Sequence, residues 1–257
     1  MSLFEELIED KVGDQKIVKS FKTKDSLCLD IFDKSEDSFK MKSEIRKRLL
    51  EISDNFTDSL GVDFFIHDIV LTGSLSNYNW SEYSDVDLHI LIDFEEIEGN
   101  DGSKSFIDII KEFFDAKKNI WNEKHNIKIK GFDVELYVQD VKEPHISSGV
   151  YSVLNDEWVI EPKKETPNID DRKILEKGEE FGKKIDFLVS KSDSENIIPK
   201  IEELRKKIKK FRQSGLESGG EYSYENLTFK LLRRNGYIEK LLNLKNTITD
   251  KKLSITQ

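Results

Sequence analysis

Asp85 and Asp87 have the residue type and the spacing expected of two ligands of a divalent metal ion. They lie in a run of alternating polar and apolar residues, which predicts a strand with both carboxylates on one face and Val86 and Leu88 on the other. Two carboxylates this close repel each other unless they share a cation. Mg²⁺ binds such oxygen ligands, usually together with substrate phosphates, so the pair predicts a site for Mg²⁺ or Mn²⁺.

A Gly-Ser turn precedes this acid pair and is suited to binding phosphate. Gly73 and Ser74 follow an apolar run at 69–71, and ten residues separate them from Asp85. Glycine lets the backbone approach a ligand closely, and backbone N–H groups in a turn bind phosphate oxygens. The hydroxyl groups of Ser74 and Ser84 are candidates to hydrogen-bond a phosphate or to orient an acid. Together with the acid pair, the turn predicts metal-assisted transfer at a nucleoside triphosphate.

This order of residues resembles the signature of the DNA polymerase β-type nucleotidyltransferase superfamily. Gly73-Ser74 matches its turn, and Ser84-Asp85-Val86-Asp87-Leu88 matches its acid pair between apolar residues. The resemblance implies a third acid on a later strand, which we expect at 127–138. Asp133 and Glu135 lie two apart there and share a face, so either could be the third ligand. We favour Glu135 because apolar residues flank it and the strand continues beyond it.

Three longer segments are similar to the predicted nucleotidyltransferases of tailed bacteriophages and some bacteria. They are residues 72–94, 133–159 and 220–241, and the similarity covers most of residues 26 to 250. It implies an α+β fold, in which a nucleotidyltransferase core with a mixed β-sheet flanked by helices is followed by a C-terminal helical region. The segment 143–150, EPHISSGV, is part of the similarity, and it either closes the sheet as a turn or contacts the acceptor.

The resemblance also implies the chemistry, which is transfer of a nucleoside monophosphate from an NTP to an acceptor hydroxyl with release of pyrophosphate. Two Mg²⁺ ions, or Mn²⁺ in their place, would be held by Asp85, Asp87 and Glu135. Asp133 is the alternative third ligand. The Gly73-Ser74 turn would hold the β- and γ-phosphates.

Three classes of acceptor fit these residues, and the sequence does not rank them. An RNA 3′ end would need a basic groove, which the net charge of −10 disfavours. A second nucleotide would make the protein a synthase of a signalling oligonucleotide, and a protein side chain or a small molecule would suit the acidic composition. Another class of function is also open, in which a non-catalytic module of the same fold binds nucleotide and metal and regulates a partner. Metal-dependent phosphoester hydrolysis is weaker, because no histidine-rich cluster accompanies the acids.

Hydrophobic periodicity predicts the elements that position these residues. Apolar residues recur every three or four positions from 43 to 60, which predicts a helix with Ser43 as its N-cap and Gly61 as its stop. Shorter patterns predict a helix over 2–10, a short strand or extended arm over 27–32, a helix over 104–122, and two strands over 150–160 with a turn at Asn155-Asp156.

The composition changes near residue 166. Glu161 to Asp171 contains two prolines and no core-forming run, so it reads as a linker between a catalytic core with N-terminal helices, 1–165, and a helical region, 166–257. The helical region should contain helices near 170–190, 195–213 and 223–244 and a flexible glycine-rich loop at 214–221. In the superfamily such a region often covers the cleft, so Arg233 or Arg234 is expected to meet a phosphate.

Cysteine usage and hydropathy indicate a reducing compartment. The single cysteine, Cys28, cannot form an internal disulfide and is expected to be a buried thiol. Residues 1–10 are acidic and lack the apolar run of a signal peptide, and no run of about eighteen apolar residues could span a membrane. We therefore expect a cytoplasmic protein, in the host cytoplasm if it is phage-encoded, that binds an NTP and no membrane.

Overall fold

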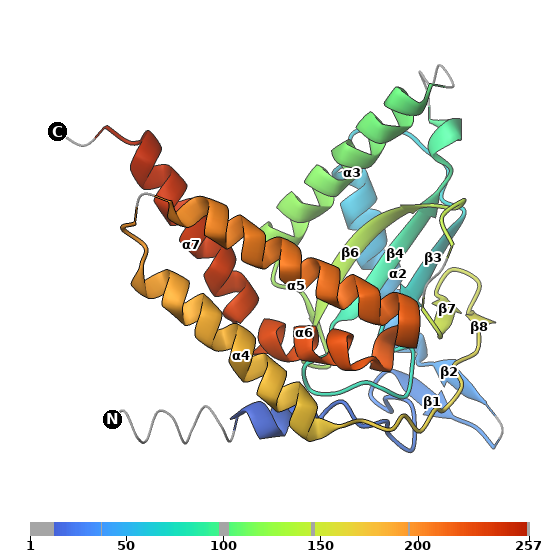
Figure 1. Ribbon diagram of the computed structural model, residues 1–257. Coiled ribbons are helices and arrows are strands. Elements are labelled where there is room, and N and C mark those ends of the chain that lie inside the picture. Colours follow the sequence, from blue (N-terminus) through green and yellow to red (C-terminus); the bar gives the residue numbers. More distant parts are fainter. Residues whose placement is uncertain (1–12, 37, 98–102, 145–146, 195, 256–257) are drawn as a thin grey trace. The chain divides into compact units, whose positions relative to one another are not determined.

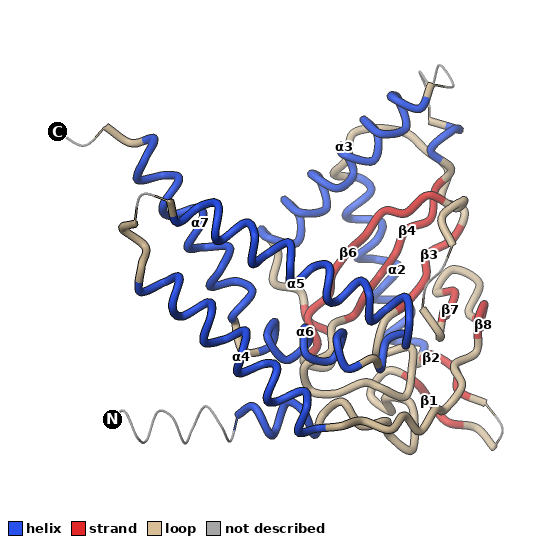
Figure 2. Tube along the Cα trace, in the orientation of Figure 1, coloured by secondary structure: helices blue, strands red, loops and turns tan. Residues whose placement is uncertain are grey.

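The computed structural model describes residues 13–36, 38–97, 103–144, 147–194 and 196–255 (Figure 1). It is an α+β structure, in which a mixed six-stranded sheet with helices is followed by a helical region. The chain divides into two compact units. Within the described residues, the strands belong to the unit formed by 23–166, as Figure 2 shows in red.

The division falls between Thr166 and Pro167, but the described N-terminal residues, 13–22, belong to the helical unit and not to the sheet unit. This differs from the expected domain over 1–165. The reason is a set of contacts with the end of one C-terminal helix. Arg234 donates a hydrogen bond to Ser20 Oγ at 2.7 Å, and its guanidinium lies over the Phe21 ring at 5.0 Å from the centroid.

The sheet unit contains a small hairpin and the main sheet. The hairpin consists of β1 (Phe32–Lys34) and β2 (Phe39–Met41). The main sheet consists of β3 (Asp68–Thr72), β4 (Val86–Ile92), β5 (Lys128–Ile129), β6 (Phe132–Asp140), β7 (Val150–Ser152) and β8 (Glu157–Ile160). Its order is β5-β6-β4-β3-β7-β8, in which β4 and β6 run parallel and the other neighbours run antiparallel.

The central strand β4 separates a core face from a polar face. Val86, Leu88 and Ile90 are buried, while Asp87 and His89 between them are half-buried. The buried residues share one hydrophobic core with the apolar stripe of α2 (Ser43–Asp58), which follows the helical period predicted for this segment. Burial of this face fixes the register of β4 and so directs the Asp87 carboxylate to the other face, while Asp85 lies just before the strand.

Helix α3 (Lys104–Lys124) begins at Ser103, whose hydroxyl accepts a hydrogen bond from the Phe106 N–H at 3.2 Å. Its last turns satisfy the backbone of β6. The Asn122 amide donates to the Leu136 carbonyl and accepts from the Leu136 N–H, both at 3.1 Å. The side chain therefore pairs with backbone groups of β6 that no strand engages there.

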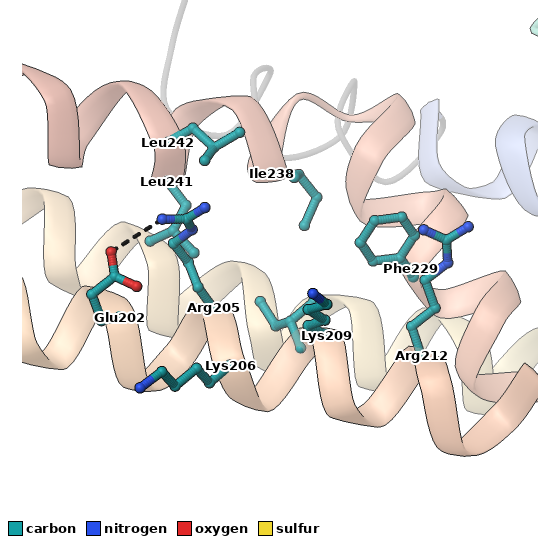
Figure 3. Close-up of a pocket in the computed structure, with 10 residues that line it drawn as sticks. Glu202, Arg205, Lys206, Lys209, Arg212, Phe229, Ile238, Leu241 and Leu242 are labelled. Atoms are coloured by element: carbon teal, nitrogen blue, oxygen red, sulfur yellow. Dashed lines mark hydrogen bonds and ion pairs between the residues drawn. The ribbon is translucent and has the colours of Figure 1, made fainter. Parts of the chain in front are cut away.

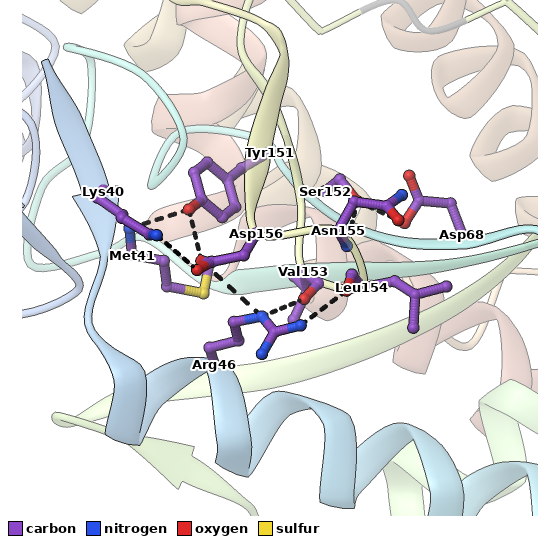
Figure 4. A network of polar contacts seen from close by, with 10 residues as sticks. All are labelled: Lys40, Met41, Arg46, Asp68, Tyr151, Ser152, Val153, Leu154, Asn155 and Asp156. Carbon is purple, nitrogen blue, oxygen red and sulfur yellow. Dashed lines mark hydrogen bonds and ion pairs between the residues drawn. The ribbon is translucent and has the colours of Figure 1, made fainter.

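A polar network joins the β1–β2 hairpin, α2 and the β7–β8 turn (Figure 4). Arg46 donates to the carbonyl oxygens of Val153 and Leu154, both at 2.7 Å. Tyr151 donates its hydroxyl hydrogen to Asp156 at 2.8 Å, and Asp156 also forms an ion pair with Lys40 at 2.9 Å. The network holds together segments far apart in the sequence at the β8 end of the sheet.

The part of the helical unit that follows the sheet unit contains four α-helices and a short 3-10 turn among its described residues. They are α4 (Asp171–Ser190), α5 (Ile197–Gly219), η2 (Gly220–Tyr222), α6 (Tyr224–Arg234) and α7 (Tyr237–Leu253). Glycines on α4 allow close helix packing, because a Cβ at Gly178 would lie 2.7 Å from Leu231 and one at Gly182 would lie 2.9 Å from the Tyr237 ring. None of the described helices combines the length and the apolar character that a membrane span requires.

Two expectations for the N-terminal half are wrong. The segment expected as a strand or arm at 27–32 is a turn up to Ile31, because the N–H groups of Ile31 and Phe32 both bond to the Cys28 carbonyl, at 3.0 and 2.9 Å. The N-cap of α2 is Lys42, and Ser43 is already helical. Cys28 is a buried thiol as expected, and burial raises its pKa. The helix expected at 2–10 lies outside the described residues.

The strand expected over 127–138 is two strands. Lys130 and Gly131 have positive φ angles of 52° and 92°, so the chain reverses there and β5 pairs antiparallel with β6. By contrast, the two strands expected over 150–160 are present as β7 and β8. The turn between them includes Asp156, which has a φ of 62°.

Two expectations for the helical region are also wrong. Most of the segment expected as a flexible loop, 214–221, is helical, because α5 continues to Gly219. Gly215 serves packing there, since a Cβ on it would lie 2.5 Å from Glu225 Cβ. The last helix, expected over 223–244, is two helices, because Gly236 has a left-handed φ of 73° between α6 and α7.

The core behind β4 can be tested by Leu88→Ala, which removes a fully buried side chain next to Asp87. We expect the free energy of unfolding to fall by about 2–5 kcal/mol because a cavity remains. The control, Leu154→Ala, makes the same change at a side chain that is 39% exposed, and should cost about 0.5 kcal/mol or less. Urea unfolding followed by tryptophan fluorescence measures both, since Trp80, Trp121 and Trp158 all lie in the sheet unit. Equal losses would contradict this description of the core.

Candidate active site

The Gly73-Ser74 turn and Asp87 lie directly against each other. Thr72 at the end of β3 pairs with Asp87 of the antiparallel β4. Gly73 follows with a φ of 74°, and a Cβ on it would lie 1.9 Å from Asp87 Oδ2. Glycine is therefore required here both by the backbone conformation and by the space that the carboxylate occupies. The fold thus brings together the turn and the acid that the sequence singled out.

Ser84 is buried and acts on the turn through Ser74. The Ser74 hydroxyl donates to Ser84 Oγ at 2.7 Å, and the Ser81 N–H donates to the same oxygen at 2.9 Å. These bonds fix the direction of the Ser74 side chain. A buried hydroxyl with two partners suits an orienting role, and direct contact of Ser84 with a nucleotide stays a prediction.

The segment 143–150 supports the turn from another part of the chain. The Ser76 hydroxyl donates a bond of 2.7 Å to the carbonyl oxygen of Gly149. A Cβ at Gly149 would lie 2.1 Å from the Ser76 carbonyl oxygen, so the two backbones meet closely. Of the two roles considered for this segment, the contacts favour the structural one. His145 lies outside the described residues.

Strand β6 places Glu135 beside Asp87. The two residues are direct partners in the parallel register of β4 and β6. The Tyr137 hydroxyl donates a hydrogen bond to Glu135 Oε2. Burial, this hydrogen bond and the charges of Glu135, Asp87 and Asp85 together raise the pKa of Tyr137. Three carboxylates therefore act on one hydroxyl, which stays protonated and keeps donating to Glu135.

Asp133 lies on the same face of β6 but has a different partner. Its carboxylate is exposed and forms an ion pair of 2.6 Å with Lys128 across the β5–β6 hairpin. Glu135 is half-buried and adjacent to Asp87 in register. This arrangement favours Glu135 over Asp133 as the third acid of the site.

Tyr137 and Lys118 lie at the site but were not predicted as site residues from the sequence. Tyr137 lies two positions after Glu135, so the same period of two would have placed it on the acid-bearing face. The His89 ring stacks on the Tyr137 ring, with 4.8 Å between their centroids. His89 Nδ1 forms a hydrogen bond of 2.8 Å with Gln139 Oε1. Lys118 of α3 places its ammonium 4.5 Å from the Tyr137 ring centroid. No local pattern marks Lys118, because its contact with the sheet spans two elements.

The acids do not form a closed metal-binding cage, so an ion bound by them would take further ligands from water or from a substrate. Among the described residues, no three His, Cys, Asp or Glu side chains converge as a group that could hold an ion. Mg²⁺ usually takes one or two carboxylates and fills the remaining positions with water and phosphate oxygens. Asp85 and Asp87, with Glu135 beside them, provide such an incomplete set, and the adjacent Gly73-Ser74 turn is where phosphates would enter.

Arg233 and Arg234 belong to the helical unit. Arg233 is exposed at the end of α6, whereas Arg234 makes the contacts with Ser20 and Phe21 described above. These contacts orient the Arg234 guanidinium within its own unit. The expected phosphate contact of either arginine stays a prediction.

No family model, no curated protein and no solved structure matches the chain. The interpretation of the site therefore depends on the chemistry and geometry of its own residues.

The contact between Gly73 and Asp87 can be tested with two matched glycines. Gly61 has nearly the same φ as Gly73, 69° against 74°, but a Cβ on it would meet nothing within 4 Å. Gly61→Ala should lower the free energy of unfolding by about 1–2 kcal/mol, because alanine is strained in the left-handed backbone conformation. Gly73→Ala must also displace the Asp87 carboxylate, so we expect a larger loss of unfolding free energy in urea. Equal losses in the two variants would show that the carboxylate does not occupy this space.

Proposed function

We propose that the protein is a metal-dependent nucleotidyltransferase of the DNA polymerase β type. It would move a nucleoside monophosphate from an NTP to an acceptor hydroxyl and release pyrophosphate. The observation that supports this most strongly is the close approach of Gly73 to Asp87, which joins a phosphate-binding turn to a metal-binding carboxylate. Glu135 in register with Asp87 adds the third acid of the signature.

In this proposal the turn binds phosphates and the acids bind the metal ions. The backbone of Gly73 and the hydroxyl of Ser74 bind the β- and γ-phosphates, and the Ser84 hydrogen bond keeps Ser74 in place. Asp85 and Asp87, with Glu135, would hold Mg²⁺ or Mn²⁺, which would supply charge neutralisation for the phosphate oxygens at the reacting centre. Most of the rate enhancement would come from this positioning and neutralisation.

Glu135 would act on the acceptor side. Tyr137 donates to its Oε2, which leaves Oε1 to receive the proton of the acceptor hydroxyl. That hydroxyl then attacks the α-phosphate in line, and the bond to the pyrophosphate oxygen breaks. Tyr137 keeps the carboxylate in one orientation, because its raised pKa holds the phenol in the donating form. A signalling oligonucleotide is the product if the acceptor is a second nucleotide.

The acid pair is tested by Asp85→Ala/Asp87→Ala. Pyrophosphate release from each of the four NTPs, with Mg²⁺ or Mn²⁺ and with free nucleotides and a short RNA as acceptors, should fall by at least about a thousandfold. The control, Asp54→Ala/Asp58→Ala, removes two exposed carboxylates from α2 and should keep wild-type rates. Unchanged turnover in the folded double variant would exclude the proposed chemistry. Nucleotide binding by the wild type without any pyrophosphate release would favour the non-catalytic module instead.

The third ligand is tested by comparing Glu135→Gln with Asp133→Asn. Each replacement removes one charge from β6, but only Glu135 neighbours Asp87 in register. We expect Glu135→Gln to lower turnover by about a hundredfold or more and to weaken Mn²⁺ binding, measured by electron paramagnetic resonance. Asp133→Asn should stay within about threefold of wild type, since it loses only an exposed ion pair. The reverse order of effects would assign the role to Asp133.

A further inference from the structure

The two units carry opposite net charge. Residues 1–22 and 167–257, which make up the helical unit, contain 24 Lys and Arg against 20 Asp and Glu, a net charge of +4, so residues 23–166 carry −14. The basic residues are concentrated on α5, which contains Lys200, Arg205, Lys206, Lys207, Lys209, Lys210 and Arg212. The acidic net charge therefore does not describe the surface of the helical unit.

A groove of about 390 Å³ runs along one side of α5 within the helical unit (Figure 3). Its cationic lining is Arg205, Lys206, Lys209 and Arg212. The rest of the lining is Glu202 and Ile208 of α5 and apolar side chains of α6 and α7, among them Phe229, Ile238 and Leu242. The cations extend over seven residues of helix, which is about 10 Å at a rise of 1.5 Å per residue.

Few negative charges balance these cations. Glu202 is the acid that lines the groove among the described residues, and it already pairs with Arg205 at 3.1 Å and with Lys245 at 2.6 Å. Lys206 and Lys209 are exposed and form no ion pair with any described residue. Two cations of the groove therefore have no partner within the part of the chain that the structure describes.

One end of the groove holds a planar cation against an aromatic ring. The Arg212 guanidinium lies 4.4 Å from the Phe229 ring centroid, and its Nε donates to Asn226 at 3.2 Å. These two contacts fix the plane of the guanidinium. Burial and the nearby charge of Arg233 lower the pKa of Arg212, so a further cation adjoins this end of the groove.

We propose that this groove binds the backbone of a single-stranded nucleic acid, which serves as the acceptor strand of the transferase. The role as acceptor strand depends on the proposed function, whereas the binding itself does not.

Three features favour a nucleic acid over an acidic peptide. Lys206 and Lys209, the two groove cations without an ion-pair partner among the described residues, lie close together on one helix, which suits successive phosphates of an extended strand. The four cations from Arg205 to Arg212 fit a ligand with several anions better than one isolated phosphate. The apolar side and the Phe229–Arg212 pair provide surfaces on which bases and riboses can lie, and a chain of carboxylates would leave them without partners.

The test measures fluorescence anisotropy of a labelled 12-nucleotide oligouridine with the full chain. Affinity should fall with salt, with a slope of about −0.7 for each phosphate contact. Lys206→Gln/Lys209→Gln should weaken binding by about tenfold or more and reduce the slope by about 1.4. It should do so equally for oligouridine and oligoadenosine, because phosphate contacts carry no sequence information.

The matched control is Lys207→Gln/Lys210→Gln, which removes two exposed cations from the same helix outside this groove. It should bind within about twofold of wild type if the groove and not the general charge is responsible. Equal weakening in both variants, or no RNA binding by wild type, would overturn the proposal. So would equal affinity for a 12-residue polyglutamate, which would indicate a protein partner.

One further variant separates this proposal from the proposed function. Asp85→Ala/Asp87→Ala lies in the other unit and should retain full RNA affinity. If RNA binding requires Lys206 and Lys209 but labelled NTP is joined to no acceptor, the groove stands and the transferase assignment fails. If transfer occurs only to other acceptors and RNA does not bind, the groove proposal fails alone.

Discussion

The contact between the Gly73 backbone and the Asp87 carboxylate is the constraint on which the rest of the site depends. A Cβ at residue 73 would lie 1.9 Å from Asp87 Oδ2, so any side chain at this position would have to displace the carboxylate. Antiparallel pairing of β3 with β4 creates the contact, and parallel pairing of β4 with β6 adds Glu135 beside it. Apolar burial on the opposite face of β4 directs the Asp87 carboxylate to the polar face.

Local patterns in the sequence predicted the parts of the site that depend on local geometry. The alternation predicted β4 and its two faces around Asp87, but Asp85 lies just before the strand and not within it. The Gly73-Ser74 turn was predicted from residue type alone. The chain reversal at Gly131 was missed because the alternation continues on both sides of it, and a glycine in a strand pattern can equally mark a bulge. Lys118 could not be predicted, because its contact with Tyr137 depends on how α3 lies against β6.

The net charge of the whole chain does not represent the charge of its separate parts. The net charge of −10 disfavours a nucleic-acid ligand, yet residues 167–257 are basic and the acidity lies in the preceding residues. The proposed metal site needs negative charge, and the proposed polyanion groove needs positive charge. Because the chain has two compact units, each surface can carry its own sign of charge. The helical unit achieves its own dense packing through small residues, since Gly178 and Gly182 let α6 and α7 approach α4.

The central claim is that the turn at Gly73-Ser74 and the acids Asp85 and Asp87 form one binding site for a metal–nucleotide complex. The most direct measurement is an experimental structure of the chain with Mg²⁺ and a non-hydrolysable NTP analogue. We predict that the metal contacts both aspartates and that the β- and γ-phosphates lie on the Gly73-Ser74 backbone. A nucleotide bound elsewhere, with neither carboxylate contacting the metal, would contradict the account.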